Sequence, residues 1–276
     1  MKIIFKIFLA LLLLLVLAIV SLNVWGWLTL GTITIDPEAQ RDNSANRVVL
    51  VSGATGSVGD GLLKAAMQDP EVAQIHVISR RSSPRIDAGV DSGRVQLHLL
   101  EDFTDYSSLS NVLPEVNTVL WGLGTSSLNV DDETFTWIHV DFPIAFVKAW
   151  LAARSEGPMS FHYITGMGTD PNGSRHWERE KGRAELEVAR MAAETDMRSF
   201  AYRSAMVRRT SERATTAEYV METLLTPGLM VITAVDLGGA MMEIAARTTE
   251  LPNGTIIDNA DSIVYAQAYK EHAAQR

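Results

Sequence analysis

The sequence predicts an α/β protein in which a doubly wound parallel sheet follows an N-terminal transmembrane helix. After residue 47, short apolar runs alternate with longer amphipathic segments, which is the pattern of parallel strands joined by helices. A glycine-rich stretch directly follows the first of these runs. Ahead of them, residues 7–30 contain no charged side chain. Together these features predict one α/β domain behind a membrane anchor.

Residues 1–30 are predicted to form an uncleaved signal anchor. The uncharged run follows Lys2 and Lys6 and, as a helix, is long enough to cross about 30 Å of hydrocarbon. Trp25 and Trp27 stand at its far end, where indole rings favour the membrane interface. A cleavable signal peptide is the rival interpretation, but its apolar region would span only about 7–15 residues. A buried core helix is the third.

The side of the membrane on which the domain lies is left open. Two lysines before the apolar run and three acidic residues between 36 and 42 predict a cytoplasmic N-terminus and a translocated domain. A nucleotide-dependent domain, however, is most easily supplied with its cofactor in the cytosol. Residues 31–46, which include Pro37, are predicted to be a linker, and residues 47–276 the folded domain.

Composition excludes several classes of function. The chain has 276 residues, a formal net charge of -9 and a hydrophobic content of 47%, which suits one sizeable domain. Net acidity without a basic stripe argues against a nucleic-acid partner. The absence of cysteine excludes disulfides and thiolate chemistry. The six histidines form no ligand pair at helical spacing, so no metal site is predicted.

The glycine-rich stretch has the features of a phosphate-binding turn. Residues 48–51 form an apolar, strand-like run, and Gly53, Gly56 and Gly59 follow in a G-x-x-G-x-x-G spacing that opens a helix over 58–67. The first glycine permits a tight turn, the second allows close approach of a pyrophosphate, and the third lets the helix lie against the sheet. The free N–H groups at the helix N-terminus favour an anion. A plain strand-to-helix connection is the alternative. The residues expected to hold a dinucleotide here are Gly53, Thr55, Gly56, Ser57, Val58 and Gly59.

The second predicted strand, residues 75–79, ends in Arg80 and Arg81. This position normally reads the adenosine ribose of a dinucleotide. An acid there would accept a hydrogen bond from the 2′-hydroxyl, whereas a guanidinium pair suits a 2′-phosphate. We therefore expect NADP(H) in preference to NAD(H). The alternative is that both arginines are solvated loop charges.

Four stretches resemble the atypical short-chain dehydrogenases/reductases, especially their NAD(P)H-binding, HTATIP2-like branch. They are SGATGSVGDGLL at 52–63, the arginine-bearing end of the second strand, WGLGTSS at 121–127 and KGRAE at 181–185. The similarity covers residues 47–268. It implies a Rossmann fold, a nicotinamide cofactor, hydride transfer and a homodimer.

The resemblance also assigns residues after the third and fourth strands. Residues 95–99 are the third strand, and Asp102 and Phe103 beyond it are expected to flank the adenine ring. A strand-end acid and a core aromatic residue are the alternative. Residues 117–121 are the fourth strand, whose carboxyl end would bring backbone beside the cofactor. The residues expected there are Gly122, Leu123 and Gly124.

Residues 131–154 are predicted to form a long, mostly core-facing helix. Its apolar side chains recur at steps of three and four residues. Pro143 inside the segment implies a kink or a late helix start. His139 is assigned no chemistry, because a lone histidine beside an apolar stripe is more often structural.

The expected catalytic motif is incomplete. In the resembling enzymes a hydroxyl after the fifth strand, here Thr165, contacts the substrate carbonyl, and a Tyr-x-x-x-Lys motif lies on the next helix. This sequence keeps Lys181, but Trp177 occupies the place of the tyrosine. Indole donates hydrogen bonds but is no comparable acid. Three explanations stay open: a group such as Thr165, Tyr163, His176 or a water relays the proton; the alignment is displaced by one residue; or the site binds NADP(H) without turnover. Lys181 as a surface lysine is the plain alternative.

The C-terminal part is predicted to form a small substrate-side lobe of the same domain. Residues 199–202 are the sixth strand, and the loop after it carries three arginines that either contact an anionic substrate or headgroup or form a solvated patch. These are Arg208, Arg209 and Arg213. Helices over 235–248 and 260–272 flank a short strand at 255–257.

The sequence therefore predicts a membrane-anchored, NADP(H)-binding oxidoreductase that acts on a small hydrophobic carbonyl or alcohol. Its competitor is a catalytically impaired scaffold that senses NADP(H) and binds a partner protein. A structural domain that binds no nucleotide is the third hypothesis. Restoring tyrosine at position 177 separates the first two.

Overall fold

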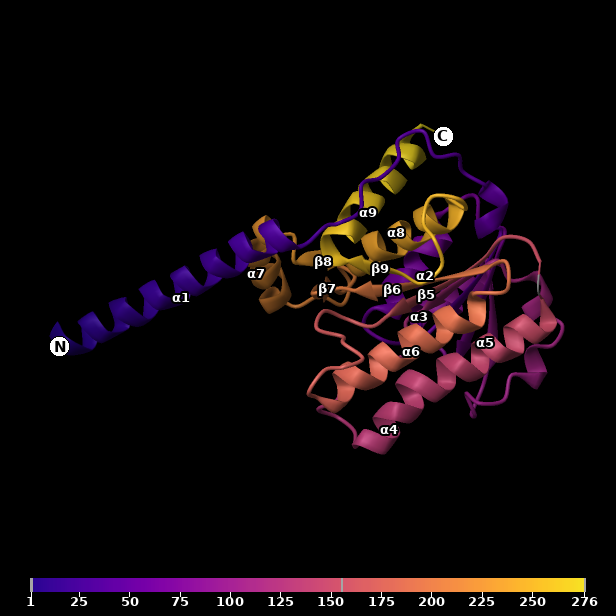
Figure 1. Cartoon of the computed structure of the whole chain (residues 1–276), viewed down its shortest axis with the longest axis horizontal. Coiled ribbons are helices and arrows are strands. Elements are labelled where there is room, and N and C mark those ends of the chain that lie inside the picture. The colour runs from indigo at the N-terminus through magenta and orange to yellow at the C-terminus, as the bar shows by residue number, and fades with distance from the viewer. Residues whose placement is uncertain (1, 155, 276) are drawn as a thin grey trace.

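The computed structural model describes residues 2–154 and 156–275. Residues 1 and 276, with which the predicted anchor begins and the predicted domain ends, lie outside the described residues, as does residue 155. A seven-stranded sheet with the order β3-β2-β1-β4-β5-β6-β9 forms the centre of the domain, and all its neighbouring strands are parallel (Figure 1). This confirms the predicted doubly wound sheet. The strands are β1 (Val48–Ser52), β2 (Gln74–Ser79), β3 (Val95–Leu99), β4 (Thr118–Trp121), β5 (Met159–Ile164), β6 (Met197–Arg203) and β9 (Thr255–Asp258).

Helices cover both faces of the sheet because its central strands are apolar on both sides. Val49 and Val51 of β1 face one core, which includes residues of α2 and α8, whereas Leu50 between them faces the other, with α5 and α6. Alternate residues of one strand thus serve two cores. The domain helices are α2 (Gly59–Gln68), α3 (Pro84–Asp91), α4 (Asp132–Thr136), α5 (Phe142–Ala153), α6 (His176–Ala192), α7 (Thr216–Leu225), α8 (Ala234–Ala246) and α9 (Asn259–Ala274).

The strand order reverses beside β1. Ser52 at its carboxyl end pairs with Ile78 of β2 on one side and with Trp121 of β4 on the other. The connections that follow β1 and β4 lead to opposite sides of the reversal, which leaves a crevice beyond the strand ends. The glycine turn and the end of β4 are therefore brought together at the place where such sheets bind ligands.

The long segment predicted at 131–154 contains an interruption. Helix α4 passes into a π-helical turn, Trp137–Asp141, and α5 then begins with Pro143 in its first turn. Proline cannot donate to the carbonyl group of residue 139. The hydroxyl of Tyr163 donates to that carbonyl instead, at 2.7 Å. The π-turn is thus held to β5.

Three elements lie in a region, 206–233, for which the sequence predicted no helix or strand. Strands β7 (Met206–Arg208) and β8 (Val231–Thr233) form a separate parallel pair. Helix α7 lies between them in the chain and is followed by a 3₁₀ turn, Thr226–Gly228. These elements form a small subdomain beside the N-terminal helix (Figure 1).

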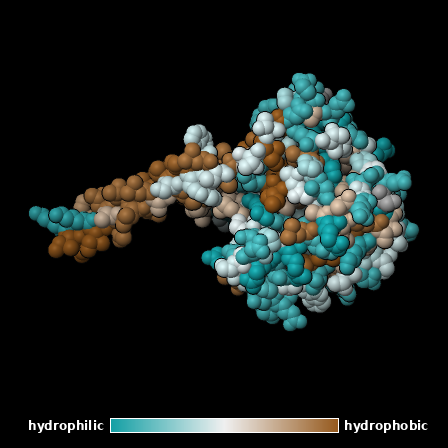
Figure 2. Space-filling model, in the orientation of Figure 1, coloured by the Kyte–Doolittle hydropathy of each residue, from teal (hydrophilic) through white to brown (hydrophobic). Residues whose placement is uncertain are grey.

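Helix α1 (Lys2–Thr29) is long and apolar enough to cross a membrane, although an N-terminal signal sequence has the same properties. It projects away from the domain and is hydrophobic along most of its length (Figure 2). Gly26 is its buried residue, at the end that meets the subdomain. A buried core helix is excluded for this segment, because its apolar side chains are exposed.

The segment 31–46, expected to be a linker, follows the surface of α8 and α9. The backbone N–H of Gly31 donates to Asp258 at 2.7 Å, and those of Thr32 and Ile33 donate to Asp261 at 2.9 Å each. Further along, the side chain of Asn46 donates to the carbonyl of Met242 at 2.7 Å. The segment is thus attached to the domain along its length.

A buried ionic cluster completes this attachment. Glu243 of α8 is fully buried and accepts a hydrogen bond from Arg247 at 2.7 Å and another from Arg41. Arg247 also donates to the carbonyl of Asp36 at 2.8 Å. A buried carboxylate requires such partners, since an unpaired one is strongly destabilising.

We predict that Glu243→Gln lowers the free energy of unfolding of the full chain in detergent by about 3–5 kcal/mol, because two arginines lose their buried counter-charge. Urea unfolding followed by circular dichroism measures the change. Glu187→Gln is the matched control, since Glu187 pairs with Arg190 on the exposed surface of α6. A loss for Glu243→Gln no larger than that of the control would contradict the prediction.

Candidate functional site

The turn after β1 is shaped by close backbone contacts. Gly53 has a φ of +73°, and a Cβ atom on it would lie 2.5 Å from the carbonyl carbon of Gly122. A Cβ on Gly59 would lie 2.1 Å from the carbonyl oxygen of Gly53. Side chains are sterically excluded at both positions. Between them, Gly56 and Ser57 are exposed at the start of α2 and leave room for an anion.

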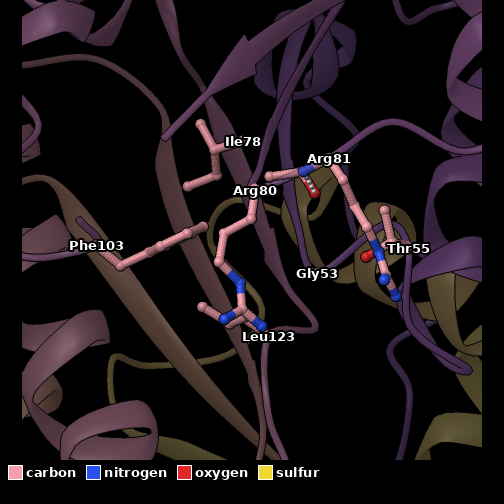
Figure 3. A pocket seen from close by; sticks show the side chains of 8 residues that line it. Gly53, Thr55, Ile78, Arg80, Arg81, Phe103 and Leu123 are labelled. Atoms are coloured by element: carbon pink, nitrogen blue, oxygen red, sulfur yellow. Dashed lines mark hydrogen bonds between the residues drawn. The ribbon is translucent and has the colours of Figure 1, made fainter. Parts of the chain in front are cut away.

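A cavity of about 380 Å³ opens beside this turn (Figure 3). The glycine turn and the end of β4 form one part of its lining, and the residues after β2 form the other. Arg80 and Arg81 extend along it, with the guanidinium group of Arg81 next to Thr55 (Figure 3). Neither arginine forms an ion pair within residues 2–154 and 156–275. The lining residues are Gly53, Thr55, Ile78, Ser79, Arg80, Arg81, Phe103 and Leu123.

A second cavity, of about 560 Å³, continues from the first towards α4 and the π-turn. The two share Arg80, Phe103 and Leu123. Gly124 and Trp137 lie further along the second cavity. The cleft therefore runs from the glycine turn across the carboxyl ends of β1 and β4.

The two residues expected beside adenine differ in their surroundings. The carboxylate of Asp102 is exposed and accepts hydrogen bonds from the backbone and hydroxyl of Thr104, at 2.8 and 2.7 Å, which lower its pKa. Phe103 is buried and stacks on Phe142, with 5.5 Å between ring centroids. Both nevertheless line the second cavity. Their contact with adenine stays a prediction.

Thr165, Lys181 and Trp177 occupy neighbouring positions after β5 and on α6. Thr165 is fully buried, and its hydroxyl lies 2.6 Å from the carboxylate of Glu185. The ammonium group of Lys181 donates to the backbone carbonyl of Thr165 at 2.7 Å. Trp177 lies one turn before Lys181 and packs over Gly168. The three residues are brought together, but the threonine hydroxyl is already engaged by a protein partner.

Burial lowers the pKa of Lys181 to about 8, and the Glu185 carboxylate opposes that shift. Glu185 itself is held by Arg203, whose guanidinium nitrogens lie 2.6 and 3.2 Å from its oxygens. The carboxylate of Glu185 therefore connects Thr165, after β5, with Arg203, at the end of β6. Glu185 ends the KGRAE stretch that carries the resemblance, but no role was predicted for it, although its spacing of four residues from Lys181 signals a shared helix face.

Two other proposed proton donors have protein partners. The phenol of Tyr163 is buried and bound to the carbonyl of His139, and burial raises its pKa far above the usual range. The imidazole Nε2 of His176 lies 3.0 Å from Thr136 and 3.1 Å from the carbonyl of Asp132 on α4. Lys181 is the side chain of this group whose pKa burial moves towards neutrality.

His139 supports the loop that follows β4. Its Nε2 atom lies 3.1 Å from the backbone nitrogen of Thr125 and 2.9 Å from the Thr125 carbonyl oxygen. Burial, followed by the nearby charge of Lys181, lowers the pKa of His139 to about 4, so the ring is neutral at physiological pH. A Cβ atom on Gly124 would meet this ring at 2.8 Å. A histidine expected to be structural therefore shapes the edge of the cleft.

Arg213 reaches the glycine turn from the segment between β7 and α7. Its guanidinium group donates to the carbonyls of Gly56 and Thr55, at 3.0 and 3.4 Å. Asp60, in the first turn of α2, accepts a hydrogen bond from Thr210 of the same segment at 2.8 Å. Arg213 thus places positive charge at the turn expected to hold a pyrophosphate. From the sequence alone Arg213 was expected only in a substrate loop, because its contact with the glycine turn joins residues far apart in the chain.

Arg208 and Arg209 are engaged elsewhere. Arg208 pairs with Glu222 at 2.7 Å, and Arg209 pairs with Glu218 at 2.5 Å, both on α7.

As for metals, the described residues contain no group of three or more histidine, aspartate or glutamate side chains that could hold an ion.

No family model matches the chain. Among curated proteins it is similar to the mitochondrial protein FMP52 of Chaetomium globosum, with 28% identity over 125 residues, covering 44% of this chain and 49% of that protein. It is also similar to Leucinostatins biosynthesis cluster protein T of Purpureocillium lilacinum, with 26% identity over 121 residues, covering 44% and 43%. The chain therefore spans less than half the length of these curated relatives.

Solved structures resemble the chain over most of its length. A 3-oxoacyl-[acyl-carrier protein] reductase from Brucella melitensis gives a TM-score of 0.61 at 15% identity, covering 79% of this chain and 97% of that one. A UDP-glucuronic acid 4-epimerase from Bacillus cereus, solved with NAD, gives 0.58 at 14% identity, covering 76% of each. A blue fluorescent protein from a metagenomic library, solved with NADPH, gives 0.58 at 14% identity, covering 80% and 99%. The chain thus has the fold of NAD(P)-binding short-chain reductases and epimerases.

Proposed function

We propose that the chain is a membrane-anchored, NADP(H)-dependent oxidoreductase of the atypical short-chain type, in the HTATIP2-like branch, with a small hydrophobic carbonyl or alcohol as substrate. The observation that carries the proposal is the cavity between the glycine turn and the Arg80–Arg81 pair. Structural neighbours solved with NAD or NADPH support a nicotinamide cofactor at such a site.

The residues present fit NADP(H). Gly56 and Ser57 at the exposed start of α2 would hold the pyrophosphate, with Arg213 beside them. Arg80 and Arg81, free of ion pairs within the described residues, would hold the 2′-phosphate. Both guanidinium groups are exposed, so two solvated loop charges are the alternative. When bound, the cofactor supplies or accepts a hydride.

The chain's own residues would position the substrate and exchange its proton. Lys181 is the candidate donor, because burial lowers its pKa to about 8, close to the pH at which it would act. Its contact with the carbonyl of Thr165 orients the ammonium group, and Glu185 and Arg203 hold the surrounding strand ends. Trp177, at the position expected for the tyrosine, packs over Gly168 and would shield this group from water.

A cofactor-sensing scaffold is the second candidate. The observation that favours it is that the hydroxyls of Thr165 and Tyr163 are both bound to protein groups. In this case NADP(H) occupancy would control binding of a partner protein.

We propose a membrane location for this chain because of the length and composition of α1. We propose a homodimer because of the resemblance to the short-chain reductases.

We predict that changing Arg80 and Arg81 together to Ala weakens NADPH binding far more than NADH binding. Each charge-assisted bond to the 2′-phosphate contributes about 1.5–3 kcal/mol, so the loss should reach at least tenfold in Kd. Calorimetric titration of the full chain in detergent measures both affinities. Changing Arg175 and Arg179 together to Ala is the control, because both side chains are exposed. Equal losses for the two cofactors would contradict a 2′-phosphate site.

Arg213→Ala should weaken NADPH and NADH to a similar extent, because both carry the pyrophosphate beside which this guanidinium lies. The expected loss is about tenfold in Kd, the value of one charge-assisted contact. The same titration measures it, and Arg209→Ala, four residues earlier and paired with Glu218, is the control. Unchanged affinity for both cofactors would remove Arg213 from the site.

Carbonyl reduction should decline as pH rises through about 8. The pKa of Lys181 is lowered in the folded protein, so its ammonium group, the proton-donating form, is present below that pH and lost above it. In Lys181→Arg the charge persists, since the guanidinium pKa exceeds about 12. The alkaline decline should therefore disappear along with most of the turnover. A wild-type profile flat to pH 10, recorded from initial rates over a carbonyl panel, would exclude Lys181 as the donor.

Trp177→Tyr separates the two candidate functions. In an oxidoreductase adapted to Lys181, the substitution should reduce turnover, because the indole that packs over Gly168 is lost. In a scaffold that has lost its acid, it should create reductase activity where the native chain has none. Initial rates with NADPH over the carbonyl panel, with Trp177→Phe as the matched control, distinguish these results.

A further inference from the structure

Helix α7 has its polar and apolar sides reversed relative to an ordinary surface helix. Its two glutamates face the domain, where Glu218 pairs with Arg209 and Glu222 pairs with Arg208. Its exposed side carries no charged residue. Instead it carries apolar and aromatic side chains that are between 36% and 53% exposed, namely Tyr219, Val220, Met221 and Leu224. A helix that faces water normally shows the opposite arrangement.

Helix α7 lies beside the domain-proximal end of α1 (Figure 1). The side chain of Asn23 in α1 donates to the carbonyl of Leu224 at 2.8 Å. Three residues later, Gly26 packs so closely on the 3₁₀ turn after α7 that a Cβ atom would lie 2.3 Å from the carbonyl oxygen of Gly228. These contacts fix α7 against α1.

The position of the contact along α1 matches the thickness of a bilayer. The uncharged run of α1 begins at Ile7, and the helical rise from Ile7 to Trp27 is about 30 Å, which is the thickness of the hydrocarbon layer. Trp25 and Trp27, both exposed, would then stand near the boundary between hydrocarbon and headgroups. Asn23 lies about one helical turn before them, within the depth of about 5–10 Å that interfacial helices reach.

We propose that the exposed face of α7 lies in the interfacial layer of the bilayer that α1 spans, so that the domain binds the membrane through two elements. This inference rests on the anchor role of α1 in the proposed function. The occupant of the face is phospholipid, at the boundary of headgroups and acyl chains. Neutral lipid suffices, because Arg208 and Arg209 are already paired with glutamates.

The arrangement ties the membrane surface to the cleft. The segment immediately before α7 contains Thr210 and Arg213, which contact Asp60 and the glycine turn. Docking of α7 therefore keeps this side of the cleft next to lipid, where a hydrophobic substrate is most concentrated.

The test uses the absence of cysteine from the chain. Val220→Cys is introduced into the full chain, labelled with a fluorophore that responds to polarity, and reconstituted into phosphatidylcholine vesicles with or without nitroxide-labelled acyl chains. Leu186→Cys on α6 is the matched control, because Leu186 is 60% exposed and helix α6 lies away from α1 (Figure 1). The label at position 220 should shift to shorter wavelength and be quenched by the nitroxide lipid, whereas the label at 186 should do neither. Leu224→Cys, on the same face, repeats the measurement.

Each other outcome overturns the proposal. Labels at 220 and 186 that respond alike in vesicles that carry the protein would show that α7 faces water. A shift at 220 without quenching, and growing with protein density in the bilayer, would show a second copy on this face instead of lipid. A chain that fails to float with the vesicles would remove both the anchor and the docking of α7. NADPH titration of the same samples keeps these results distinct from a failure of the nucleotide site.

Discussion

The cleft depends on a contact between backbones at the reversal point of the sheet. The turn after β1 and the end of β4 approach so closely that side chains are excluded at Gly53 and Gly59. Because Gly53 also has a positive φ, an L-residue there would add backbone strain to a steric clash. This contact exposes the start of α2 and sets it opposite the arginines after β2. Every proposed cofactor contact follows from that geometry.

Around this contact the domain is held together by charged groups with protein partners. Glu185 and Arg203 join the ends of β5 and β6 beneath Lys181, and Glu243 ties α8 to the segment that leads from α1. Arg80 and Arg81 differ from these groups, because both are exposed and neither forms an ion pair within the described residues. Two guanidinium groups that line one cavity with the glycine turn favour an anionic ligand there.

Local patterns allowed the fold to be predicted, whereas long-range contacts limited the prediction of the site. The apolar runs of β1 to β6 and the glycine spacing depend on neighbouring residues alone, so the sheet and the tight turn after β1 could be predicted, whereas phosphate binding at that turn stays a prediction. Strands β7 and β8 are only three residues long, and α7 has reversed polarity, so periodicity does not reveal its partner surface. Arg213 meets residues more than 150 positions away, and no local pattern reports such a contact.

The central claim is that the chain binds NADP(H) at the glycine turn. Calorimetric titration of the unmodified full chain in detergent, with NADPH and NADH in separate experiments, tests it most directly. Our account predicts saturable binding of NADPH at one site per chain, with weaker binding of NADH. If neither NADPH nor NADH gave a binding heat, the central claim would be contradicted. The cleft would then lack the ligand that its arginines imply.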